Sequence, residues 1–123
     1  MSKKLSSFIQ QWMGFQFSSG GETGADYLKF QTGFRSVLAD IAKESGYHIH
    51  KFSKNHYCCC AVLQQDETGA FAYISIPDVR FWPDEWITRV LYRQMRTEKD
   101  WTGRRNHYCS LDELGESLKR LYA

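Results

Sequence analysis

The chain has 123 residues, of which 42% are hydrophobic and 15% aromatic, and its formal net charge is +2. This length predicts a single domain over residues 1–123, and the composition excludes a disordered chain. The small positive charge excludes the strongly basic composition of a dedicated nucleic-acid-binding domain, although it permits an anionic partner.

The N-terminal segment, residues 2–13, has apolar residues at helical spacing and predicts an amphipathic helix. Polar residues interrupt this segment, so it differs from the continuous apolar run of a signal peptide. No stretch of the sequence is long enough to span a membrane. We therefore expect a cytoplasmic protein without a membrane partner, in which the four cysteines stay reduced.

A second helix is predicted from residue 26 to residue 45, after a Gly- and Ser-rich loop over residues 15–25. Gly46 follows as the left-handed residue that ends this helix. The loop holds no complete phosphate-binding motif, which argues against a nucleotide site there. The buried stripe of the helix is expected to comprise Tyr27, Phe30, Phe34, Val37, Leu38 and Ile41.

From residue 47 the apolar pattern changes to a period of two, which predicts strands. Three strands are expected over residues 47–53, 56–65 and 70–76, joined as an antiparallel meander. Gly69 suits the end of a hairpin loop, and Pro77 ends the third strand.

Pro83, Asp84 and Glu85 suit the first turn of a helix, because proline needs no hydrogen-bond donor there and acidic groups favour the helix dipole. We therefore predict a helix from residue 83 to about residue 95, with Arg89, Arg93 and Arg96 on its outer face. A further helix begins at the capping box of residues 110–113. The predicted fold is α+β, a three-stranded antiparallel sheet packed with flanking helices in the order α-α-β-β-β-α-α.

Residues 78–108 concentrate three of the four tryptophans and six arginines. These residue types contribute most binding energy at protein interfaces and also serve nucleic-acid surfaces. The pattern does not separate a protein partner from a nucleic acid, and a solvated helix face with Glu85 paired to Arg89 is the alternative. The predicted partner-binding residues are Arg89, Arg93, Arg96, Lys99, Trp101, Arg104 and Arg105.

The tetrapeptide of residues 55–58 recurs at residues 106–109, and each copy gives His-x-Cys. Residues two apart on an extended segment point to the same face, so two such pairs would supply two imidazoles and two thiolates for zinc. The spacing is not that of a standard zinc finger, and the alternative is that Cys58 and Cys60 are small buried apolar residues. The candidate zinc ligands are His56, Cys58, His107 and Cys109, with Cys60 as a substitute and His48 and His50 as a further pair.

Cysteine, histidine and acidic residues are present, but none has the spacing of a known catalytic motif. No nucleophile, base and orienting group can be assigned together. The sequence therefore predicts a non-enzymatic protein, in which Asp78 pairs with Arg80 or caps the following turn.

One pattern extends from residue 74 to residue 108. It comprises Ser75-Ile76, Asp78-Val79-Arg80, Trp86, Leu91, Arg93, residues 99–103, Asn106 and Tyr108. It resembles small uncharacterised proteins of bacterial mobile elements, the accessory proteins of phages and conjugative elements. This chain has Arg104 where the pattern has a second glycine, which adds charge to the loop.

In size and type the chain is also similar to anti-CRISPR proteins, which mobile elements encode against host defence. That similarity implies a non-enzymatic inhibitor in the host bacterial cytoplasm. Such an inhibitor binds a CRISPR effector nucleoprotein of the Cas9 type and blocks its nucleic-acid handling. A direct DNA- or RNA-binding accessory protein and a zinc-stabilised protein-interaction module are the alternatives.

Overall fold

The computed structural model describes residues 2–17, 24–55, 58–102 and 104–123. The α+β class is confirmed, whereas the three-stranded sheet and the predicted element order are wrong. The elements are α1 (Lys3–Trp12), α2 (Ala25–Glu44), β1 (Tyr47–Asn55), β2 (Cys58–Gln65), β3 (Phe71–Ser75), α3 (Glu85–Thr88), β4 (Val90–Met95), β5 (His107–Cys109), η2 (Leu111–Glu113) and α4 (Leu114–Leu121).

The sheet has five antiparallel strands in the order β1-β2-β3-β4-β5. Its first three strands form the predicted meander. Gly69 adopts a φ of +76° in the hairpin loop between β2 and β3, and Gly46 adopts +86° after α2. Both glycines therefore have the left-handed conformation that their positions in the sequence predicted.

Residues 90–95 form β4 and not the second half of a helix, which corrects the sequence prediction. The helix signals at Pro83–Glu85 do start a helix, but α3 lasts only one turn. Val90 and Tyr92 belong to the β-branched and aromatic types that favour strands. The free edge of β3 offers β4 a row of backbone partners, and pairing there satisfies the hydrogen bonds of the whole segment.

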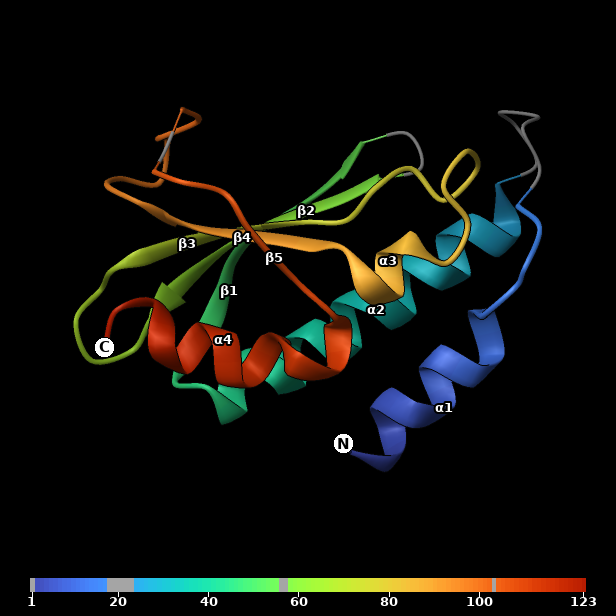
Figure 1. Cartoon of the computed structure of the whole chain (residues 1–123), viewed down its shortest axis with the longest axis horizontal. Coiled ribbons are helices and arrows are strands. Elements are labelled where there is room, and N and C mark those ends of the chain that lie inside the picture. Colours follow the sequence, from blue (N-terminus) through green and yellow to red (C-terminus); the bar gives the residue numbers. More distant parts are fainter. Residues whose placement is uncertain (1, 18–23, 56–57, 103) are drawn as a thin grey trace.

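The helices α1, α2 and α4 all lie on one side of the sheet (Figure 1). The core lies between them and the sheet, where Leu63, Ile74 and Val90 of the strands are almost fully buried. Trp86 from α3 fills one end of this core, with its ring 5.2 Å from that of Phe30 in α2. The described residues of the β4–β5 connection, 96–102 and 104–106, project on the other side of the sheet (Figure 1).

The last helical segment begins where the capping box predicted, but the box takes a different form. The Ser110 hydroxyl donates to the Glu113 carboxylate (2.6 Å) instead of capping a backbone N–H, and the first turn is the 3₁₀ helix η2. No helix among the described residues is long and apolar enough to cross a membrane.

Candidate binding surface on the open face of the sheet

The side of the sheet opposite the helices is called the open face here. Side chains alternate between the two sides of a strand, so residues next to buried core positions point to this face. Val62, Tyr73 and Arg93 are in register across β2, β3 and β4, and all three belong to the open face. The guanidinium carbon of Arg93 lies 4.6 Å from the centre of the Tyr73 ring.

Arg93 holds the β4–β5 connection against the open face. Only 5% of its side chain is exposed, and it donates hydrogen bonds to the carbonyl oxygens of Asp100 and Trp101, each 3.1 Å long. The Trp101 ring then packs edge-on against Tyr73, with ring centres 6.2 Å apart. Earlier in the connection, the His50 ring of β1 forms a hydrogen bond of 2.5 Å with the Glu98 carboxylate. The connection is therefore fixed to both β4 and β1.

A second set of contacts shapes the connection from within. The Asp100 carboxylate is buried and accepts hydrogen bonds from the backbone and the side chain of Arg96. This hydrogen bond raises the pKa of the Arg96 guanidinium, and the negative charge of Asp100 adds to the shift. Thr102 donates to the same carboxylate. Arg96 thus stabilises the fold of the connection, and the carboxylate of Asp100 balances its charge.

Several aromatic side chains project from the open face into solvent. The exposed fractions are 58% for Trp101, 56% for Trp82 and 51% for Tyr108. Arg89 stacks on Tyr108, with its guanidinium carbon 5.0 Å from the ring centre. Large rigid rings in contact with an arginine are typical of the residues that dominate binding at interfaces.

A cleft of about 310 Å³ lies between Trp82 and Tyr108. Its floor comes from the open face, through Ser75 of β3 and Leu91 of β4. Glu85 and Arg89 place one negative and one positive group at its wall. The cleft is therefore partly apolar and close to neutral, which suits a protein side chain better than a phosphate.

The predicted partner-binding residues do not lie on one element. Arg89, Arg93 and Arg96 were expected on one outer face of a helix, but they lie on the C-cap of α3, within β4 and after β4. The prediction of a shared helix face is therefore wrong, because residues 90–95 are extended. Lys99 and Trp101 are exposed on the β4–β5 connection, as are Arg104 and Arg105, which line a separate cleft.

The predicted partner-binding residues did not include Phe81, Trp82 and Tyr108, which are exposed. The Phe81 ring is exposed and lies under the guanidinium of Arg80, which also pairs with Asp78 at 2.8 Å as predicted. One available signal was that Trp82 precedes Pro83 outside any periodic apolar pattern. Tyr108 had no such local signal, because its place on the open face follows from the pairing of β5 with β4.

The structure places two of the four candidate zinc ligands, Cys58 and Cys109, far apart. Cys58 is on β2 and Cys109 on β5, so three strand spacings, or about 14 Å, separate their strands. Cys58 points to the open face, whereas Cys109 points toward α4 and contacts Ser117. His56 lies outside the described residues. Zinc binding by this set stays a prediction, which elemental analysis of the purified protein would test.

The remaining candidates for metal binding have other contacts. The Cys60 thiol lies 3.7 Å from the Ser75 hydroxyl on the open face. His48 bonds Asp66 at 2.7 Å, and His50 bonds Glu98. Among the described residues, no three His, Cys, Asp or Glu side chains gather closely enough to hold a metal ion.

The cysteines of β2 differ in burial, and burial sets their acidity. Cys59 points into the core, where removal from water raises the pKa of its thiol to about 12. Burial also raises the pKa of the Cys58 thiol, although Cys58 is only partly covered. A nucleophilic cysteine needs a lowered pKa, so neither thiol has the electrostatic environment of a reactive one.

Comparison with known proteins adds no relative, because no family model, no curated protein and no solved structure matches the chain.

Proposed function

We propose that this chain is a non-enzymatic binding protein whose docking surface is the open face of the sheet. One observation carries the proposal: Trp82, Trp101 and Tyr108 are each more than half exposed on that face. Exposed tryptophans are costly to leave in water and are strongly enriched among the residues that dominate protein interfaces.

A protein surface fits this face better than a nucleic acid. A face that binds single strands needs unpaired cations around its aromatic rings, so that they follow the phosphate backbone. Here Arg93 is buried under the β4–β5 connection, and Glu85 lies beside Arg89 in the cleft. The cleft between Trp82 and Tyr108 is therefore almost without net charge, and two lysines, Lys51 and Lys99, lie beside Trp101.

For the partner we propose a nucleoprotein of bacterial host defence, most specifically a CRISPR effector of the Cas9 type. The support is the resemblance of residues 74–108 to accessory proteins of mobile elements, together with the small size of the chain. Such an inhibitor needs no active site, because it acts by covering a surface that the effector uses for nucleic acid.

The test is a binding measurement against a panel of purified CRISPR effectors. We expect at least one effector to bind the wild-type chain, and the double variant Trp82→Ala/Trp101→Ala to lose at least about 30-fold in affinity, which corresponds to about 2 kcal/mol. The matched control is Leu28→Ala, which removes a side chain that is 55% exposed on α2, on the helix-covered side. It should bind like the wild type.

Two outcomes would count against the proposal in different ways. Failure of every effector to bind would remove the proposed class of partner. Undiminished binding by the double variant would show that another surface docks. The variants should be compared at equal folded fraction, which a thermal melt verifies.

A further inference from the structure

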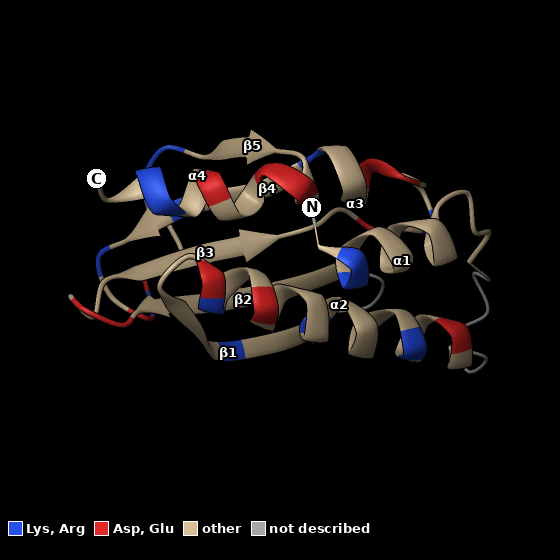
Figure 2. Cartoon of the chain, turned by 90° about the horizontal axis from the view of Figure 1, so that it is seen from below, with Lys and Arg blue, Asp and Glu red and all other residues tan. Residues whose placement is uncertain are grey.

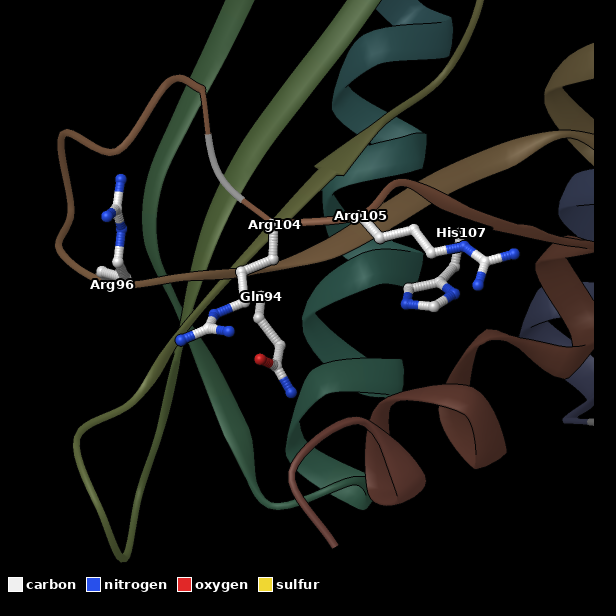
Figure 3. Close-up of a pocket in the computed structure, with 5 residues that line it drawn as sticks. All are labelled: Gln94, Arg96, Arg104, Arg105 and His107. Atoms are coloured by element: carbon white, nitrogen blue, oxygen red, sulfur yellow. The ribbon is translucent and has the colours of Figure 1, made fainter.

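A second cleft, of about 580 Å³, lies where the β4–β5 connection returns to the sheet (Figure 3). The backbone N–H of Arg104 lies 3.5 Å from the Gln94 carbonyl oxygen at this point, just before β5 begins. No carboxylate is among the described residues of the lining. The described residues that line it are Gln94, Arg96, Arg104, Arg105 and His107.

Two of the three arginines of this cleft form no ion pair with the part of the chain that the structure describes. Arg96 bonds the Asp100 carboxylate, and its side chain points away from the others (Figure 3). Arg104 and Arg105 are exposed and form no ion pair with any described residue. The cleft therefore has a net positive charge from two guanidinium groups.

The floor of the cleft is held in place by neighbouring elements. The Gln94 side chain donates a hydrogen bond of 2.7 Å to the carbonyl oxygen of Leu121 in α4. The His107 ring stacks on Tyr92, with ring centres 5.3 Å apart and planes at 28°. These contacts fix two polar groups between the arginines, so the ligand meets a preformed surface.

We propose that this cleft binds a ligand with two or more phosphate groups, through Arg104 and Arg105. A planar guanidinium matches the geometry of phosphate oxygens and stays charged at every physiological pH. In Figure 3 Arg104 runs beside Gln94 and Arg105 runs past His107, so their charged ends point to different sides. Two charges set apart suit phosphates in series better than a single anion.

Phosphates in series occur in the backbone of a polynucleotide and in a nucleoside triphosphate. This site is independent of the docking surface proposed above, because none of Trp82, Trp101 and Tyr108 lines it. A protein that docks on a nucleoprotein would gain, through this cleft, a second contact, this one with the nucleic acid.

The test uses the chain alone, without any partner, and the anisotropy of a fluorescent single-stranded oligonucleotide of about ten nucleotides at low salt. We expect Arg104→Ala/Arg105→Ala to weaken binding at least tenfold. The slope of log K against log salt should fall in magnitude by about 1.4, since each phosphate contact on a single strand contributes about 0.7.

The matched control is Lys29→Ala/Arg35→Ala, which removes two positive charges from α2. It should change the affinity less than twofold, and Trp82→Ala/Trp101→Ala should leave it unchanged. Equal losses in the cleft and control variants would overturn the proposal, because they would indicate binding by general charge. Absence of oligonucleotide binding and of triphosphate binding at low salt would overturn it as well.

Competition separates the two sources of phosphate. Displacement of the labelled strand by a nucleoside triphosphate, but not by inorganic phosphate at the same concentration, identifies a nucleotide site. Displacement only by unlabelled oligonucleotide identifies a backbone site. Displacement by inorganic phosphate as readily as by either would contradict a ligand with phosphates in series.

Discussion

At the scale of single residues, Arg93 shows how context decides the role of a charged side chain. In the sequence it is one of several arginines that suit a binding surface. In the structure it is buried between Tyr73 and the β4–β5 connection. Its guanidinium donates hydrogen bonds to the backbone carbonyls of Asp100 and Trp101, and buried backbone carbonyls are almost always hydrogen-bonded in native proteins.

Replacing Arg93 by alanine should destabilise the protein by about 2 kcal/mol, because it leaves the carbonyls of Asp100 and Trp101 without their donor. Urea denaturation measures this change. Hydrogen exchange at residues 97–102 should rise in the same variant. Arg89→Ala, which removes an exposed arginine stacked on Tyr108, should stay within about 0.5 kcal/mol of the wild type. Equal stability of both variants would refute the anchoring role of Arg93.

Two buried titratable groups, the Cys59 thiol and the Tyr47 hydroxyl, lead to a second prediction at this scale. Burial raises the pKa of the Cys59 thiol from 9.0 to about 12 and that of the Tyr47 hydroxyl from 10.0 to about 12. Above about pH 9 the folded chain therefore keeps protons that the unfolded chain releases. The free energy of unfolding should then fall as the pH rises, by about 1.4 kcal/mol per unit for the thiol.

The check is urea denaturation at about pH 8 and about pH 10.5. Between these values the Cys59→Ala variant should lose about 2 kcal/mol less stability than the wild type, because its core has no thiol to ionise. The variant will also be less stable than the wild type at pH 8. The quantity to compare is therefore the change in the free energy of unfolding between the two pH values. An identical loss in both proteins would show that Cys59 makes no contribution to the alkaline response.

At the scale of elements, the periodic segments were predictable and the segment after Pro83 was not. Helix α2 and strands β1 to β3 follow the period of their apolar residues, with Gly46 and Gly69 at the ends. These signals are local, so the sequence contains all of them. The assignment of residues 90–95 depends instead on the free edge of β3, which exists only after the sheet has formed.

The candidate site was predictable in part for the same reason. Trp101, Arg104 and Arg105 are exposed because they belong to a polar connection, which the sequence indicates. Trp82 and Tyr108 join them on the surface only through the pairing of β3, β4 and β5. That pairing brings together residues from distant parts of the chain, and no local pattern contains it.

The short helix α1 provides a prediction at the scale of elements. It packs on α2 through Phe8, whose ring centre is 5.4 Å from that of Phe30 and 5.5 Å from that of Trp86. Gly33 of α2 makes this close approach possible, because a Cβ there would lie 2.7 Å from the Phe8 ring. Phe8→Ala should therefore cost about 3–5 kcal/mol in urea denaturation.

The control for Phe8 is Met13→Ala, since Met13 follows α1 and its side chain is 58% exposed. It should alter stability by less than about 0.5 kcal/mol. A small effect of Phe8→Ala, comparable with that of the control, would mean that α1 adds little to the core.

At the scale of the whole molecule, the two sides of the sheet have different chemistry. The helix-covered side has both basic and acidic residues on α2 and α4 and basic residues on α1 (Figure 2). The open face has exposed aromatic rings, a nearly neutral cleft and the anchored β4–β5 connection. The positively charged cleft of Arg104 and Arg105 lies next to α4, to which its lining residue Gln94 is hydrogen-bonded. This asymmetry is the basis for placing the docking surface on the open face.

The measurement that tests this account most directly is hydrogen exchange of the chain, free and in complex with an effector that binds it. We expect slower exchange in residues 78–91, 98–102 and 107–109, which form or border the open face, and no change in α1 and α2. Protection confined to α1 and α2, with the open face exchanging as in the free chain, would contradict the central claim.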